Sequence, residues 1–166
     1  MLKSTNPRTL LAGSGARILI VDNDEAFAKF FKIHLSRFFS DVFVTGNPKD
    51  ALTWFENEPF DLVIIDVNLP RIGGFSLARR IRKTVKDVSI IFTTTFELNE
   101  DQKSKIDDND AVLVKPFTMK EFHSCVKKGL NEKLRNWNPS GETSAEAEQF
   151  LEEKKGSKSK EKQKSA

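Results

Sequence analysis

The sequence predicts an α/β fold with a doubly wound, five-stranded parallel sheet, and two patterns in the chain support this prediction. Short apolar runs rich in Val, Ile and Leu alternate with segments in which apolar residues recur every three or four positions. Such runs are typical of strands buried on both faces, and such spacing is typical of amphipathic helices. Five strands that alternate with five helices favour a parallel sheet with helices on both of its faces.

The first half of the chain contains three of these strands, each followed by a helical pattern, at residues 17–22, 41–45 and 60–66. Asp24 is placed to cap the first helix, because its carboxylate can accept a hydrogen bond from a free backbone N–H group. Asn47 and Pro48 form a cap and first-turn pair for the second helix, and Pro59 ends that helix. These signals fix the order of elements in this half.

The second half contains the two remaining strands, at residues 88–94 and 111–114. Gly73 and Gly74 mark the loop before the third helix. The polar, weakly periodic segment 97–107 predicts a short, exposed fourth helix. Thr118 is followed three residues later by Glu121, which is the capping-box pattern and predicts the start of the last helix.

Composition divides the chain of 166 residues into one folded domain and two tails. Residues 1–16 have the character of a flexible leader, and residues 17–134 form the domain. Residues 135–166 are expected to be a linker and a low-complexity, charged tail that is largely disordered. Within this tail, residues 144–155 show a weak helical pattern.

Charge and composition indicate a cytoplasmic protein. The chain has 27 basic and 24 acidic residues, whereas nucleic-acid binders carry a strongly basic face. It has neither a signal-peptide core nor an apolar run that could span a bilayer, and its single cysteine, Cys125, excludes an internal disulfide. We therefore expect a reducing compartment, no nucleic acid on the domain and no membrane association.

Histidine and tryptophan offer no further site in the sequence. His34 and His123 lack the spaced partners that a metal site needs, so we expect helix-surface or partly buried positions for both. Trp54 and Trp137 are better explained as packing residues than as stacking platforms for nucleic acid.

Four of the predicted strands end on hydrophilic residues, namely Asp22, Asp66, Thr94 and Lys115. The carboxyl ends of parallel strands meet at one edge of the sheet, and open α/β sheets bind their ligands there. Two carboxylates, a hydroxyl and an ammonium group at one edge suit a divalent cation and a phosphoryl group.

The stretches around these residues resemble the receiver domain of two-component response regulators. They read ILIVDND, DLVIIDVNLPRIGG, IIFTTT and VLVKPF, and they cover residues 17 to about 132 in the family's order. The resemblance implies the flavodoxin-like (βα)5 receiver fold. It also implies a stand-alone phosphoacceptor that receives its phosphoryl group from a sensor histidine kinase or a phosphotransfer protein and signals to a further protein. Such a protein is not an enzyme in the usual sense, although it can catalyse its own phosphotransfer and dephosphorylation.

The chemistry of phosphoryl transfer and the resemblance together assign a role to each residue of the pocket. Asp66 is the expected nucleophile and phosphoacceptor, and a carboxylate in that role needs Mg²⁺ and further donors to offset charge repulsion. Asp22 would help to hold the Mg²⁺, and the resemblance adds the backbone carbonyl of Asn68 as a ligand. Lys115 and Thr94 would contact phosphate oxygens as a cation and as a hydroxyl donor.

Three positions depart from the family pattern, namely Asn23, Val112 and Thr95, and the last of these replaces the small residue that usually follows the switch threonine. Asn23 stands where receivers usually carry a second acid that binds Mg²⁺ directly, so the metal site loses one negative charge and we expect weakened Mg²⁺ binding. Asp24 either compensates through water or only caps the following helix. Val112 occupies the switch position that is commonly aromatic, so the aromatic relay is missing.

One further feature agrees with the family pattern. The cis peptide bond that is typical of receivers is expected between Lys115 and Pro116.

Two alternative functions remain open from the sequence. The first is a phosphorylation-deficient pseudo-receiver that serves as an interaction module, and Asn23, Val112 and Thr95 support it. The second is a phosphatase of the haloacid-dehalogenase type, because Asp22 and Asp24 satisfy that family's DxD motif. Against the phosphatase, no cap domain is visible in the sequence and Asp66 would have no role.

Overall fold

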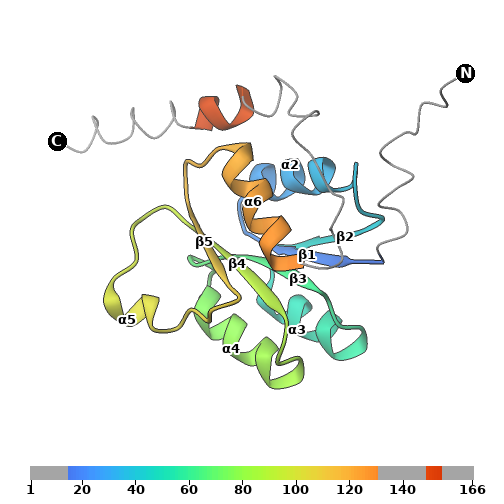
Figure 1. The fold of residues 1–166 in the computed structure, drawn as a ribbon. Helices are drawn as coiled ribbons and strands as arrows, with labels where there is room; N and C mark the ends of the chain where they lie inside the picture. Colours follow the sequence, from blue (N-terminus) through green and yellow to red (C-terminus); the bar gives the residue numbers. More distant parts are fainter. Residues whose placement is uncertain (1–14, 131–148, 155–166) are drawn as a thin grey trace, which may run out of the picture.

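The computed structural model describes residues 15–130 and 149–154, and in these residues it contains a five-stranded parallel sheet (Figure 1). The strands lie in the order β2-β1-β3-β4-β5. Their bounds are β1 Arg17–Val21, β2 Asp41–Thr45, β3 Leu62–Asp66, β4 Ser89–Thr94 and β5 Ala111–Val114. The predicted α/β class and the predicted parallel sheet are confirmed.

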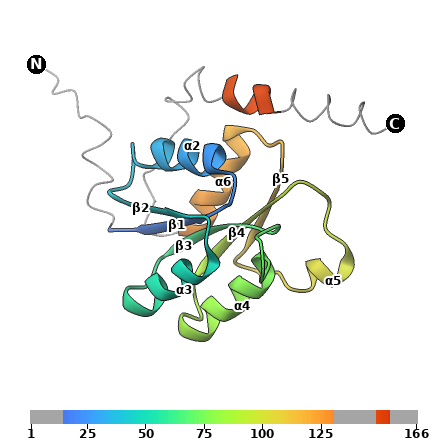
Figure 2. The same cartoon turned by 180° about the vertical axis from the view of Figure 1, so that it is seen from behind.

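Helices cover both faces of the sheet, as Figures 1 and 2 show from opposite sides. Their bounds are α2 Glu25–Leu35, α3 Pro48–Asn57, α4 Gly74–Thr84, α5 Glu100–Lys103 and α6 Met119–Leu130. Helices α2 and α6 pack on one face of the sheet, and α3 and α4 pack on the other. The chain therefore has the doubly wound architecture that the alternating pattern predicts.

Alternating residues of the inner strand β1 contribute to both halves of the core. Ile18 and Ile20 pack with α2 and α6, whereas Leu19 and Val21 pack with α3 and α4. All four side chains are buried, which explains why the strand is apolar at each of the positions after Arg17. Val21 lies opposite Ile65 of β3, so β1 and β3 reach the same edge of the sheet together.

The predicted helix starts are confirmed by their hydrogen bonds. Asp24 caps α2 by accepting a bond from the backbone N–H of Phe27 at 3.0 Å, and Asn47 caps α3. Before α6, the backbone N–H of Glu121 donates to the Thr118 hydroxyl oxygen at 3.2 Å. The Glu121 carboxylate in turn accepts from the backbone N–H of Thr118 at 2.7 Å, which completes the capping box.

The fourth helix is shorter than its prediction. The sequence analysis expects a helix over 97–107, but only Glu100–Lys103 is helical, and none of its residues is buried. The apolar residues of this segment, Leu98 and Ile106, pack against the core on the α3 and α4 face from outside the helix. A segment with so little apolar surface on one side cannot stabilise a longer helix by packing.

The tails lie mostly outside the described residues. This holds for the leader up to residue 14, for residues 131–148 with Trp137, and for residues 155–166. Residues 149–154 are helical and fall within the weak helix expected at 144–155. In the described part of the chain, no helix is both long and apolar enough for a bilayer span.

His34 and His123 occupy different positions from those expected. Both side chains are buried, and they face each other between α2 and α6, with 2.7 Å between their Nε2 atoms. Burial, with the neighbouring His123, lowers the pKa of His34 to about 4, and burial lowers the pKa of His123 to about 4. The sequence spacing could not show this pair, because its members lie 89 residues apart on separate helices.

The histidine pair makes stability depend on pH. The unfolded histidines take up protons below about pH 6.5, whereas the folded pair stays neutral to about pH 4. The free energy of unfolding is therefore expected to fall by about 2 to 4 kcal/mol between pH 7 and pH 5. Urea unfolding at both pH values measures this change. A double variant, His34→Leu with His123→Leu, is expected to lose most of the pH dependence, and equal dependence in both proteins would contradict the assignment.

Candidate phosphorylation site

The four hydrophilic strand ends meet at one edge of the sheet. Asp22 directly follows β1, Asp66 ends β3, Thr94 ends β4 and Lys115 directly follows β5. These four strands are neighbours in the sheet, and the chain leaves β1 toward β2 on one side and returns to β3 on the other. The two carboxylates therefore stand at the point where the strand order reverses, which is where open α/β sheets form a binding crevice.

Lys115 joins the two carboxylates of this edge. Its Nζ lies 2.9 Å from Oδ2 of Asp22 and 3.2 Å from Oδ2 of Asp66. Only 3% of Asp22 and 7% of Asp66 are exposed to solvent. Burial raises the pKa of Asp22, and the Lys115 ammonium opposes that rise. Two buried negative charges thus share one positive charge, and the cluster has a net negative charge when both acids are ionised.

Backbone N–H groups fix the second oxygen of each carboxylate. Oδ1 of Asp22 accepts a bond from the N–H of Asp24 at 2.8 Å, and Oδ1 of Asp66 accepts from the N–H of Asn68 at 2.7 Å. Each side chain is therefore held at both oxygens, by a backbone donor on one and by Lys115 on the other. Such fixed orientation favours a reacting group, because less reorganisation is needed on reaction.

Phe27 is a part of the site that the sequence analysis missed. The Lys115 Nζ lies 3.9 Å from the centroid of the Phe27 ring, a geometry that stabilises an ammonium group through the ring's electrons. Phe27 stands in the first turn of α2, and its sequence pattern indicates only an apolar helix face. The peptide bond between Lys115 and Pro116 is cis, as the resemblance predicts.

Thr94 is turned toward its own loop. Its hydroxyl donates to the carbonyl oxygen of Phe96 at 3.2 Å and accepts from the N–H of Phe96 at 3.3 Å. The neighbouring Thr93 pairs with Asp66 in the sheet register, and its buried hydroxyl has no hydrogen-bond partner among the described residues. Thr94 must therefore exchange these bonds with Phe96 before its hydroxyl can serve another acceptor.

The site suits Mg²⁺ better than a metal that needs several side-chain ligands. Within residues 15–130 and 149–154, no three His, Cys, Asp or Glu side chains gather closely enough to hold a metal ion. Asp22 and Asp66 offer hard oxygen ligands with an excess negative charge, and Mg²⁺ takes few protein oxygens and keeps several waters. Asn23 is exposed beside them. Asp24 caps α2 and pairs with Lys154, so its carboxylate already has partners.

Two further positions complete the comparison with the sequence. Val112 is partly buried in β5 and packs against the core on the α3 and α4 face, so an aliphatic side chain occupies the switch position. Gly74 approaches the end of β3 so closely that a Cβ there would overlap the carbonyl oxygen of Asp66 and lie 2.8 Å from Cα of Val67. This close approach explains the glycine, which the sequence pattern alone marks only as a turn.

The chain belongs to the response regulator receiver domain family, whose model matches residues 18–127. Fold, pocket and family therefore define a receiver domain of the two-component type. The matched residues include Asp22, Asp66, Thr94 and Lys115.

Relatives and solved structures support this assignment. The chain is 32% identical over 126 residues to the uncharacterized transcriptional regulatory protein YvcP of Bacillus subtilis, covering 75% of this chain and 52% of YvcP. It is 30% identical over 136 residues to the autoinducer 2 sensor kinase/phosphatase LuxQ of Vibrio vulnificus, covering 80% of this chain and 16% of LuxQ. It thus spans about half of one relative and a small part of the other.

Among solved structures, the response regulator TrrA of Thermotoga maritima in complex with Mg²⁺-BeF matches with a TM-score of 0.60 and 31% identity. That match covers 69% of this chain and 99% of TrrA. The non-phosphorylated HemR receiver domain of Leptospira biflexa matches with a TM-score of 0.62 and 28% identity over 70% of this chain and 94% of HemR.

Proposed function

We propose that this chain is the phosphoacceptor of a two-component phosphorelay and that Asp66 accepts the phosphoryl group. The observation that carries this proposal is the arrangement of Asp66 and Asp22 around the single ammonium group of Lys115. A structural ion pair needs only one carboxylate. A second buried carboxylate beside it adds repulsion and is explained by a cation that binds during function.

In the proposed reaction, an oxygen of the Asp66 carboxylate attacks phosphorus and forms a new P–O bond. The bond between phosphorus and the donor's leaving atom breaks, and that atom keeps the electron pair and takes up a proton. The product is an acyl phosphate on Asp66. Lys115 then turns from Asp66 to a phosphoryl oxygen, and Thr94 donates its hydroxyl once its bonds to Phe96 are broken.

Asp22, Asp66 and the backbone carbonyl of Asn68 would hold the Mg²⁺ in this pocket. When bound, Mg²⁺ offsets the negative charge that the phosphoryl group brings to Asp66. The Mg²⁺-BeF complex of the related TrrA supports this role. Asn23 offers an amide oxygen in place of a carboxylate, so the affinity for Mg²⁺ is expected to be lower than with two adjacent acids.

The proposed function requires two kinds of partner protein, one before and one after the phosphoryl transfer. A sensor histidine kinase or a phosphotransfer protein donates the phosphoryl group, and a further protein reads the change around Thr94 and Lys115. One relative, LuxQ, is a sensor kinase/phosphatase, and another, YvcP, is a transcriptional regulatory protein. The chain acts in the cytoplasm and turns over no substrate other than its own phosphoryl group.

Incubation of the full chain with acetyl phosphate and Mg²⁺, followed by intact-mass spectrometry, tests the proposed function. We expect one phosphoryl group per chain, and no adduct when a chelator removes the Mg²⁺. The absence of an adduct at every Mg²⁺ concentration would contradict the proposal and favour the pseudo-receiver, which shares the fold without the chemistry.

Replacing Asn23 by Asp is expected to raise the affinity for Mg²⁺ by about tenfold, because it restores a charged oxygen ligand. The half-saturating Mg²⁺ concentration, measured by calorimetry, gives the change. Asn109→Asp is the matched control, because Asn109 is exposed near the start of β5, at the opposite edge of the sheet. Equal affinities in the two variants would show that residue 23 does not contribute to Mg²⁺ binding.

A further inference from the structure

The helical segment 149–154 lies near α2 and α6 (Figure 1) and packs against the α2 and α6 face of the domain. It lies outside the family match, which ends at residue 127. The ring of Phe150 stacks on Phe30 of α2, with 4.2 Å between centroids and 9° between planes. Leu151 is only 4% exposed and joins the core cluster on the α2 and α6 face. The segment is therefore anchored by buried apolar contacts.

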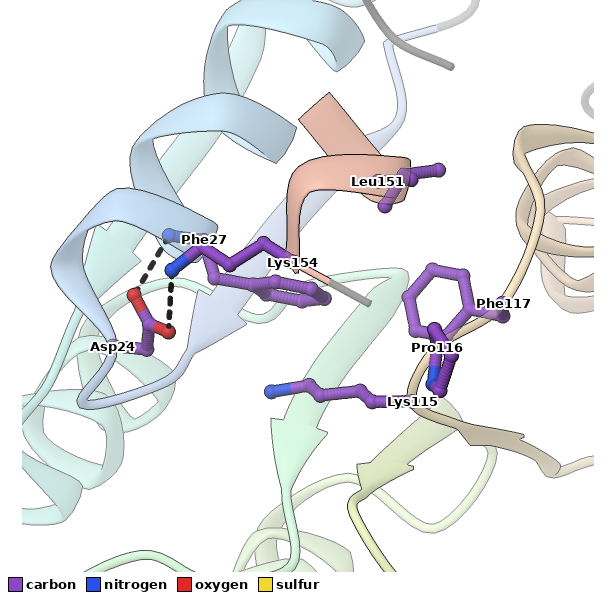
Figure 3. A pocket seen from close by; sticks show the side chains of 7 residues that line it. All are labelled: Asp24, Phe27, Lys115, Pro116, Phe117, Leu151 and Lys154. Atoms are coloured by element: carbon purple, nitrogen blue, oxygen red, sulfur yellow. Dashed lines mark hydrogen bonds and ion pairs between the residues drawn. The ribbon is translucent and has the colours of Figure 1, made fainter. Parts of the chain in front are cut away.

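Leu151 covers a small apolar cavity that also borders the pocket lysine (Figure 3). The cavity has a volume of about 50 Å³, and Phe27, Phe117 and Lys115 line it together with Leu151. Phe27 is the ring over which the Lys115 ammonium lies. Phe27 thus contacts Lys115 and also forms part of the surface on which the segment docks.

Lys154 places a second ammonium group beside the loop that contains Asp22 and Asp24. Its Nζ lies 3.2 Å from Oδ2 of Asp24, whose other oxygen caps α2, as Figure 3 shows. The backbone N–H of Asp24 in turn donates to the carboxylate of Asp22 at 2.8 Å. Lys154 therefore pairs with a residue, Asp24, that lies two positions after Asp22 on the loop that would carry the metal.

We propose that residues 149–154 form a regulatory segment. When docked on the domain, this segment lowers the affinity of the proposed site at Asp22 and Asp66 for Mg²⁺. This inference rests on the proposed function, because it needs Mg²⁺ to bind beside Asp22. Two cations near the same acidic loop repel each other, so the docked Lys154 lowers the affinity for Mg²⁺. By thermodynamic linkage, bound Mg²⁺ weakens docking of the segment by the same factor. Loading of the site thereby uncovers the apolar surface of Phe27, Phe30 and Phe117.

Nuclear magnetic resonance of the full chain with labelled leucine methyl groups tests both directions of this coupling. Without Mg²⁺, the Leu151 methyl signals are expected to be shifted by the neighbouring aromatic rings. Titration with Mg²⁺ alone is expected to move them toward their values in an unstructured chain. Lys154→Gln keeps the side-chain length but removes the charge, and it is expected to raise the Mg²⁺ affinity about two- to fivefold.

Two more variants make the result decisive. Leu151→Ser removes the apolar anchor, so it is expected to release the segment and to raise the Mg²⁺ affinity as Lys154→Gln does. Lys83→Gln removes the same charge at the exposed end of α4 and is expected to change nothing. The Mg²⁺ affinity is read from the backbone amide signal of Asn68, which is independent of the Leu151 methyl groups.

The proposal is overturned if Lys154→Gln and Lys83→Gln bind Mg²⁺ equally, or if saturating Mg²⁺ leaves the Leu151 signals unchanged. It is also overturned if these signals are those of an unstructured chain before Mg²⁺ is added, or if no variant binds Mg²⁺. Phosphorylation of Asp66 is measured separately by mass spectrometry. A chain that is phosphorylated but shows no coupling contradicts this proposal alone, and a coupled chain that never accepts a phosphoryl group contradicts the phosphoacceptor function alone.

Discussion

Asp66→Asn is expected to reduce phosphoryl incorporation from acetyl phosphate by at least about 100-fold, because an amide replaces the attacking carboxylate. The variant keeps the shape of the side chain, and its amide oxygen can still accept the bond from the N–H of Asn68 that holds Asp66 in place. Lys115 can still pair with Asp22, so the fold should persist. Intact-mass spectrometry after a fixed incubation with Mg²⁺ measures the loss.

Asp108→Asn serves as the matched control for this experiment. Asp108 is exposed before β5, at the edge of the sheet opposite the pocket, so its replacement is expected to leave incorporation unchanged. An adduct that persists in Asp66→Asn would contradict the assignment. If that adduct maps to Asp22, the phosphatase interpretation of the Asp22-Asn23-Asp24 stretch gains support instead.

Gly74→Ala is expected to lower the free energy of unfolding by about 3 kcal/mol or more, or to prevent folding. The added Cβ would overlap the carbonyl oxygen of Asp66 and crowd Cα of Val67. Both atoms belong to the backbone, so the clash cannot be relieved by a rotamer change and must displace the end of β3 or α4. Urea unfolding followed by circular dichroism measures the effect.

Gly46→Ala provides the comparison for Gly74→Ala. A Cβ at Gly46 would approach no atom closer than 3.4 Å, which is an ordinary contact. Its effect is expected to stay within about 0.5 kcal/mol. Similar losses of stability in both variants would mean that the tight packing of Gly74 against Asp66 is not what requires the glycine.

The strands and the pocket could be predicted from the sequence because both depend on local patterns. Buried strands are apolar at every position, so their ends are visible as the change to Asp22, Asp66 and Lys115. The parallel arrangement then places these ends at one edge without any knowledge of side-chain contacts. The caps at Asp24 and Thr118 were predictable for the same reason, since a cap lies within three residues of its partner.

The parts that escaped prediction depend on contacts between distant segments. The pairing of His34 with His123 and the position of Phe27 over Lys115 follow from how α2 packs on the sheet, and no spacing rule contains that information. The weak helical pattern at 144–155 predicted a helix around residues 149–154, but it could not show that this helix packs on the domain. Its burial depends on the aromatic surface that α2 provides.

Asp22 and Asp66 share the single ammonium group of Lys115, so repulsion between the two carboxylates lowers the free energy of unfolding when no cation is bound. Like charges are kept together at this edge by the hydrophobic core, at a cost in stability that the rest of the fold offsets. A cation that enters the pocket removes part of that repulsion and binds only the folded chain, so it also raises resistance to denaturation. Under the proposed function, Mg²⁺ occupancy of this pocket can therefore be followed by how readily the molecule unfolds.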